Sequence, residues 1–152
     1  MDAKVRAALD EALADEYKAR ATYTRVIEAF GPVQPFVNIL ESEGRHIGAL
    51  YALYAAHGIS PPADDWQGRI DAPATVAEAC KAAVEAEIEN AAMYERLLND
   101  VGDPEIRRVL ERLRAASRDN HLPAFERCLD REGAGEATGT GRRRRHRYGR
   151  RS

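Results

Sequence analysis

The opening segment constrains the fold most strongly, because residues 2–30 contain neither proline nor glycine. A helix from Asp2 to Phe30 would be about 40 Å long at roughly 1.5 Å per residue. The sequence "GPVQP" follows directly. It ends the helix, since glycine frees the backbone and proline cannot continue helical hydrogen bonding. The chain therefore begins with one long helix, which favours a helical bundle over a sheet.

Three further helices are marked by their end signals. The second runs from Pro35 or Phe36 to His57 and stops at Gly58, a residue suited to the position after a helix. The third begins at a capping box formed by Thr75 and Glu78 and continues to about Val101. The fourth is capped by Asp103, has Pro104 in its first turn and continues to about Arg131.

The connections between these helices predict how the helices pair. Short links join the first helix to the second and the third to the fourth, whereas residues 58–74 form a long, proline-containing link. Short links place neighbouring helices antiparallel. We therefore predict an all-α fold, with two antiparallel helical hairpins packed into a four-helix bundle over residues 1–132.

Charge divides the chain into two parts. The net charge is −2, but residues 133–152 carry about +6, which leaves about −8 on residues 1–132. A segment rich in glycine and arginine cannot bury enough apolar surface to become ordered, so residues 133–152 are predicted to be disordered. The arginines of residues 142–151 could bind nucleic acid or an acidic partner. The alternative is a tail that only aids solubility.

Composition also bears on location and on the cysteines. No run approaches eighteen apolar residues and the first residues are too charged for a secretory signal, so we expect a cytoplasmic protein that does not span a membrane. Cys80 and Cys128 stand far apart and form no Cys-x-x-Cys motif, which argues against a zinc knuckle or a rubredoxin-like iron site. Each is expected to be a reduced residue of the core.

Ionisable residues fall on the apolar faces of the predicted helices. On the second helix, Glu43 and His46 share a face with Ile39 and Leu50. The same reasoning places one ionisable residue on the inward face of each other helix: Glu16 on the first, Glu89 on the third and His121 on the fourth.

A lone buried carboxylate costs several kcal/mol, and a domain has only about 5–15 kcal/mol of net stability. Arg20 and Arg45 project away from these faces, so a central cation is the expected compensation. Glutamate oxygens with imidazole nitrogens suit iron or manganese, and the spacing of Glu43 and His46 puts both donors one helical turn apart. A single Glu-x-x-His is common by chance, and His121 alone could be a hydrogen-bonded core histidine.

Three segments resemble rubrerythrins of the ferritin-like superfamily: "EYKARATY" at residues 16–23, "ESEGRH" at residues 41–46 and "ENAAMY" at residues 89–94. The segments "FGPVQPFVNILESEGRH" and "ASRDNHLPAF" are also similar to a bacterial ferritin-like family of unknown function. The resemblance implies metal ligands at Glu16, Glu43, His46 and Glu89, with Glu89 bridging. It also implies that Tyr23 and Tyr94 are hydrogen-bonding neighbours of the ligands; the alternative is that they are simple core aromatics.

The fourth helix departs from the rubrerythrin pattern. Arg118 stands three residues before His121, where those proteins have a glutamate, and Ala86 replaces their additional glutamate on the third helix. The number of metal ions per chain, one or two, is therefore left open by the sequence. Pro123 should also distort the helix just after His121.

The function that follows is a non-haem iron oxidoreductase reacting with oxygen or hydrogen peroxide, of ferroxidase or peroxidase type. It would hold iron, or alternatively manganese. Because no rubredoxin-like cysteine set is present, it would need an external electron donor or would instead oxidise ferrous iron as its substrate. The rival is a non-catalytic helical bundle that docks on nucleic acid or an acidic partner through its arginine-rich tail. A homodimer is expected only by analogy with the superfamily.

Overall fold

A computed structural model describes residues 1–134, and this part of the chain is helical without strands. The helices are α1 (Ala3–Phe30), α2 (Phe36–Ala56), α3 (Val76–Leu98) and α4 (Pro104–Ala115). A π-helical turn, η1 (Ala116–His121), follows α4, and residues 122–134 continue as an α-helix. The predicted all-α four-helix bundle is confirmed. The predicted disorder of the arginine-rich tail concerns mainly residues 135–152, which lie outside the described part.

The end signals read from the sequence act as expected. The Thr75 hydroxyl accepts a hydrogen bond from the Glu78 amide, and the Glu78 carboxylate accepts one from the Ala74 amide. The Asp103 side chain accepts two amide hydrogen bonds at the start of α4. The third helix is shorter than predicted, because it ends at Leu98 rather than near Val101.

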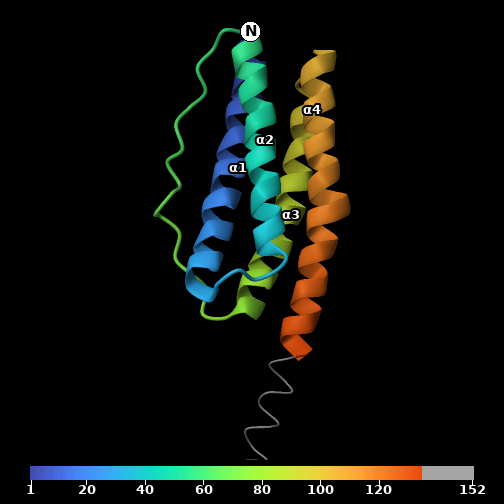
Figure 1. Cartoon of the computed structure of the whole chain (residues 1–152). Coiled ribbons are helices and arrows are strands. Elements are labelled where there is room, and N and C mark those ends of the chain that lie inside the picture. The colour runs from blue at the N-terminus through green and yellow to red at the C-terminus, as the bar shows by residue number, and fades with distance from the viewer. Residues whose placement is uncertain (135–152) are drawn as a thin grey trace, which may run out of the picture.

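The helices form two antiparallel hairpins, α1 with α2 and α3 with α4 (Figure 1). Figure 1 also shows that α2 and α3 point in the same direction, so the connection between them must return along the whole bundle, and it does so beside α1. This geometry is the reason that the second connection is long. None of the helices of residues 1–134 is long and apolar enough to cross a membrane.

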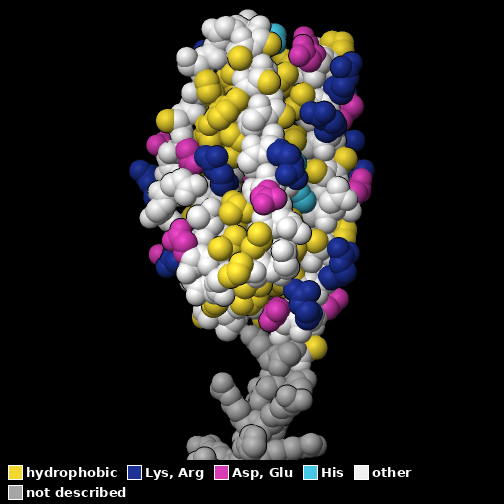
Figure 2. Space-filling model, in the orientation of Figure 1, with side chains coloured by type: hydrophobic (Ala, Val, Ile, Leu, Met, Phe, Trp, Pro, Cys, Tyr) yellow, Lys and Arg dark blue, Asp and Glu magenta, His cyan; other side chains and the backbone are white. Residues whose placement is uncertain are grey.

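The core consists of two apolar clusters with a polar layer between them. One cluster contains Leu13 and Leu50 and fills one end of the bundle; the other contains Val26 and Phe36 and fills the opposite end. In sequence, every buried glutamate and histidine falls between members of the two clusters on its own helix. Over α2, Figure 2 shows the same order at the surface, with apolar side chains above and below charged ones at mid-height.

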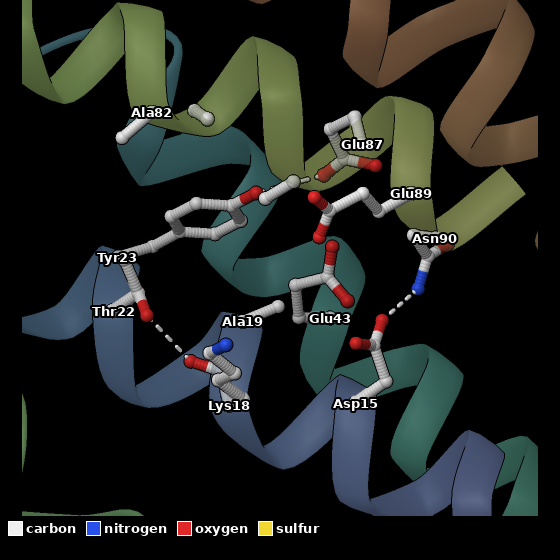
Figure 3. A pocket seen from close by; sticks show the side chains of 12 residues that line it. Asp15, Lys18, Ala19, Thr22, Tyr23, Glu43, Ala82, Glu87, Glu89 and Asn90 are labelled. Atoms are coloured by element: carbon white, nitrogen blue, oxygen red, sulfur yellow. Dashed lines mark hydrogen bonds between the residues drawn. The ribbon is translucent and has the colours of Figure 1, made fainter. Parts of the chain in front are cut away.

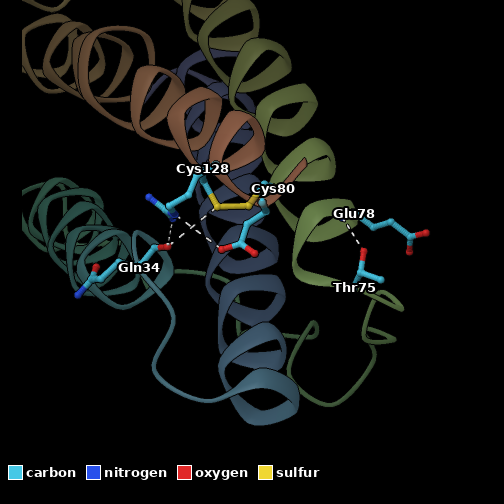
Figure 4. Close-up of a disulfide and its surroundings, with 7 residues drawn as sticks. Gln34, Thr75, Glu78, Cys80 and Cys128 are labelled. Atoms are coloured by element: carbon cyan, nitrogen blue, oxygen red, sulfur yellow. Dashed lines mark hydrogen bonds and ion pairs between the residues drawn. A yellow bond between two sulfur atoms is a disulfide. The ribbon is translucent and has the colours of Figure 1, made fainter. Parts of the chain in front are cut away.

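A disulfide joins α3 to the last helical segment, which corrects the expectation that both cysteines are reduced. Cys80 and Cys128 are fully buried, and their Cα atoms lie 5.9 Å apart, within the span that a disulfide bridges (Figure 4). The Cys128 sulfur also lies 4.0 Å from the Gln34 carbonyl oxygen. Sequence separation hid this pairing, since the two cysteines stand 48 positions apart and only the packing of the helices brings them together.

The predicted distortion near Pro123 takes the form of the π-helical turn. Within it the Leu122 amide donates to the Ser117 carbonyl, one residue further back than in an α-helix. Pro123 has no amide hydrogen to donate, so it is tolerated where the ordinary hydrogen bonding is already interrupted. The wider turn brings both Ser117 and His121 into the buried layer.

Candidate metal centre

Five buried side chains from all parts of the bundle meet in the polar layer. They are Glu16 of α1, Glu43 and His46 of α2, Glu87 of α3 and His121 of η1. They form two groups of three: Glu16, Glu43 and His46, and Glu43, Glu87 and His121. Within each group, one donor atom per residue lies within 4.8 Å of the others, and Glu43 belongs to both groups.

The Glu43 carboxylate serves each group with a different oxygen. His46 Nδ1 lies 3.6 Å from Glu43 Oε2 and 3.5 Å from Glu16 Oε2. His121 Nδ1 lies 3.3 Å from Glu43 Oε1 and 3.5 Å from Glu87 Oε1. A carboxylate placed in this way can bridge two cations, with each cation contacting one imidazole nitrogen.

Four donor atoms of the layer are buried and have no hydrogen-bond partner: Glu16 Oε2, Glu43 Oε2, His46 Nδ1 and His121 Nδ1. Leaving a buried polar atom unsatisfied normally costs about 1–3 kcal/mol. Because all four atoms belong to the two groups, binding of a common ligand explains their missing hydrogen bonds better than four unrelated losses do. Divalent cations that accept oxygen and imidazole nitrogen would satisfy them together, so the donor set fits a metal site.

One serine holds both histidines. Ser42 Oγ lies 3.3 Å from His46 Nε2 and 3.1 Å from His121 Nε2. A hydroxyl oxygen can accept two hydrogen bonds, so both rings can be protonated at Nε2 and donate to Ser42. That tautomer leaves each Nδ1 lone pair facing the carboxylates, as metal ligation requires.

Two tyrosines donate hydrogen bonds to the outer glutamates, Glu16 and Glu87, which each belong to only one group of three. Tyr23 of α1 donates to Glu87 Oε1 at 2.8 Å, and Tyr94 of α3 donates to Glu16 Oε1 at 2.5 Å. Each tyrosine stands seven residues after the glutamate of its own helix and binds the glutamate of the other helix. The two hairpins therefore supply matching halves of the layer.

Solved structures show which fold this arrangement belongs to. A hypothetical protein, MJ0754 from Methanococcus jannaschii, has a TM-score of 0.78 and 25% identity over 88% of this chain and 83% of its own. The hypothetical protein rv2844 of Mycobacterium tuberculosis has a TM-score of 0.69 and 20% identity, over 84% of this chain and 91% of its own. A ferritin-like diiron-carboxylate protein of Bacillus anthracis has a TM-score of 0.66 and 22% identity, over 85% of this chain and 99% of its own.

The fold is that of the ferritin-like proteins. No family model matches the sequence, and no curated protein matches it either. A ferritin-like bundle with buried carboxylates and histidines close together at its centre fits metal binding.

On α3 of this ferritin-like bundle, the inward glutamate is Glu87 rather than Glu89. The expectation that Glu89 lies on the buried face is wrong, because its side chain is exposed and belongs to neither group of three. In this geometry Glu43, not Glu89, belongs to both groups of three. The spacing of Glu16 and Tyr23 held the missing signal: counting back seven residues from Tyr94 gives Glu87.

The sequence has no glutamate at position 118 or 86. Near His121, polar side chains instead form a chain of hydrogen bonds. Ser117 donates to Asn90 Oδ1, and the Asn90 amide donates to Asp15. Burial raises the pKa of Asp15 to about 6, although the hydrogen bond from Asn90 works against this shift. The layer therefore offers three carboxylates and two imidazoles.

The ionisable groups of the polar layer also shift one another's pKa values. Burial raises the pKa of Glu16 to about 8, and repulsion from Glu43 adds to this. Burial works against the charged form of each histidine, but the carboxylates raise the pKa of His46 to about 10 and that of His121 to about 9. Protonated histidines thus balance charge as well, so buried acids alone do not require a metal, and a metal ion would have to displace protons.

Proposed function

We propose that the polar layer binds two divalent metal ions, one in each group of three, with Glu43 shared between them. Iron is the metal we propose and manganese the alternative, because carboxylate oxygen with imidazole nitrogen suits both. The observation that carries this proposal is the convergence of four unpartnered buried donor atoms on one site. Three protein residues per ion leave coordination positions open to a small molecule.

We further propose that the protein is a non-haem iron oxidoreductase whose substrate is oxygen or hydrogen peroxide. Iron, when bound, supplies the electrons for reducing such a substrate. The chain's own residues orient the donors: Ser42 holds both imidazoles, while Tyr23 and Tyr94 hold the outer glutamates. The apolar clusters pack on both sides of the layer.

The source of electrons divides this proposal into two forms. A ferroxidase would take them from ferrous iron as substrate, and a peroxidase would need an external donor. Cys80 and Cys128 are joined to each other and do not make a rubredoxin-like iron site. Their disulfide is a bond more common in oxidising compartments, so the cytoplasmic location stays a prediction from the sequence.

Metal content tests the proposal most directly. Protein purified without chelator and titrated aerobically with ferrous iron should bind two ions per chain and gain absorbance as the iron is oxidised. Glu43→Gln should lose both ions because its carboxylate serves both groups, whereas Glu87→Gln should lose one. Glu85→Gln is the matched control, since Glu85 is exposed on the same helix. Full binding by the Glu43 variant would refute the site.

A second function concerns the arginine-rich residues 142–151, which lie outside the described part. The contrast between about +6 in residues 133–152 and about −8 in residues 1–132 favours docking on nucleic acid or an acidic partner. Deleting residues 135–152 should abolish salt-sensitive retention on DNA and leave metal binding unchanged. Retention that survives the deletion would refute this function. A homodimer stays a proposal by analogy, tested by the mass of the protein in solution.

A further inference from the structure

A cavity between α1 and α3 connects the metal centre to the surface. It has a volume of about 60 Å³ and is lined by Glu43 and Glu87 on its inner side. Alanines on both helices leave it open, among them Ala19 and Ala86. A water molecule needs roughly 10–15 Å³ of such space, so the cavity can hold several.

An outer groove continues this cavity. Its volume is about 330 Å³, and it shares Asp15, Lys18 and Glu89 with the inner cavity. Trp66 of the long connection forms part of its wall. The two spaces therefore adjoin, and the three shared residues lie between them.

The inner end of the path presents a buried carboxylate. Glu43 is only 2% exposed and lines the cavity. In Figure 3 the carboxylates of Glu43 and Glu89 point toward each other across the cavity. A cation at the passage would thus meet Glu89 first and Glu43 next.

The charges at the passage favour a cation. Asp15 and Glu89 are acidic, whereas the Glu11 carboxylate in the outer groove is paired with Arg96. The Lys18 ammonium lies against the groove wall, 5.4 Å from the centre of the Trp66 ring and within cation–π range. Acidic side chains at the mouth of a low-dielectric cleft raise the local concentration of cations.

We infer that the opening between α1 and α3 is the route by which a divalent metal ion reaches the centre, with Glu89 as a transient ligand. This inference rests on the proposed metal site. An ion that binds at the centre must shed part of its water, because carboxylate oxygens and imidazole nitrogens take coordination positions there. The Glu89 carboxylate replaces part of that water at the surface and passes the ion to Glu43, after which Glu89 is free again.

The test follows the loading of Co²⁺ into the full-length protein after chelator treatment and dialysis. Stopped-flow absorbance reports the change when Co²⁺ leaves water for oxygen and nitrogen ligands, and the plateau gives the amount bound. Glu89→Gln removes the charge at the passage, Ala86→Leu narrows the cavity with a good helix former, and Glu85→Gln is an exposed control on the same helix.

We expect Glu89→Gln to load about tenfold more slowly at low salt, with an unchanged plateau, because one unit charge is lost from the path of a doubly charged ion. The difference should shrink as salt rises. Ala86→Leu should also slow loading, whereas Glu85→Gln should match the wild type.

Three results would overturn the inference in different ways. Wild-type rates in both Glu89→Gln and Ala86→Leu would show that the ion uses another path. A lowered plateau in Glu89→Gln would make Glu89 a permanent ligand. If the wild type takes up no Co²⁺ at all, the proposed metal site itself is refuted, and this outcome is distinct from the other two.

Discussion

Replacing Ser42 with alanine should weaken both metal positions at once. Ser42 is the shared partner of two imidazoles from different helices, with distances of 3.3 Å to His46 Nε2 and 3.1 Å to His121 Nε2. Without the hydroxyl, neither ring is held in the orientation that directs Nδ1 at the carboxylates. The other ring nitrogen could then be protonated in its place, and each ring would have to be reoriented before ligating.

The size of the effect follows from these two hydrogen bonds. Each is worth about 0.5–1.5 kcal/mol net, so losing both costs about 1–3 kcal/mol. Divided between two metal positions, this cost corresponds to roughly a three- to tenfold loss of affinity at each position. Groups that orient a metal ligand commonly contribute about 10–100-fold to metal affinity, so the expected loss lies at or below the lower end of that range.

The assay is a titration of chelator-treated protein with Co²⁺ in competition with a chromogenic chelator, which yields both affinity and stoichiometry. Ser117→Ala is the matched control, because Ser117 is a buried serine of the same layer that donates to Asn90 instead of meeting a histidine. A thermal melt checks folding. Alanine is a better helix former than serine, so Ser42→Ala should not unfold α2.

Unchanged affinity in Ser42→Ala would refute the argument that this hydroxyl fixes the two histidines. A loss confined to one of the two ions would also contradict it, because the serine contacts both rings. An equal loss of metal affinity in Ser117→Ala would show that removing any hydroxyl from the polar layer has this effect, whether or not it contacts a histidine.

Three further outcomes are expected. Replacing Cys80 and Cys128 together with serine should lower the free energy of unfolding by about 4 kcal/mol, as loop entropy predicts for a separation of 48 residues, and a loss under about 1 kcal/mol in urea unfolding would contradict this. Tyr94→Phe should weaken the metal position that uses Glu16 and spare the one that uses Glu87, since Tyr94 donates to Glu16; equal weakening in the competition titration would contradict this. Metal at about a hundredfold above its dissociation constant should add about 3 kcal/mol per occupied site, or about 5 kcal/mol for both sites, to the stability of the wild type but not of Glu43→Gln, and a thermal shift in both would speak against binding at the layer.

Much of the fold was predictable because its signals are local. Capping by Thr75 and Asp103 depends on residues within one turn, and the ends of the first two helices are set by nearby glycine or proline. Connection length then fixed the pairing of the helices. On α2, Glu43 and His46 could be placed because large apolar residues on the same face define its inward direction.

The third helix was harder to read, and this explains the confusion of Glu87 with Glu89. Alanines occupy several sides of α3, so burying any one side is worth little and the apolar pattern gives the helix no clear orientation. The two glutamates stand two residues apart and therefore point in quite different directions. Packing against the tyrosine of α1 turns Glu87 inward, through its hydrogen bond with Tyr23.

The sequence by itself determined the features that depend on residues near one another in the chain. These are the ends of the helices and the presence of charged residues on their apolar faces. Only the tertiary structure decided which atoms meet. The sharing of Glu43, the serine between two histidines and the disulfide all join residues of separate helices or of distant turns. Their distances depend on how each helix is rotated about its axis, and that rotation is set by the packing of the whole bundle.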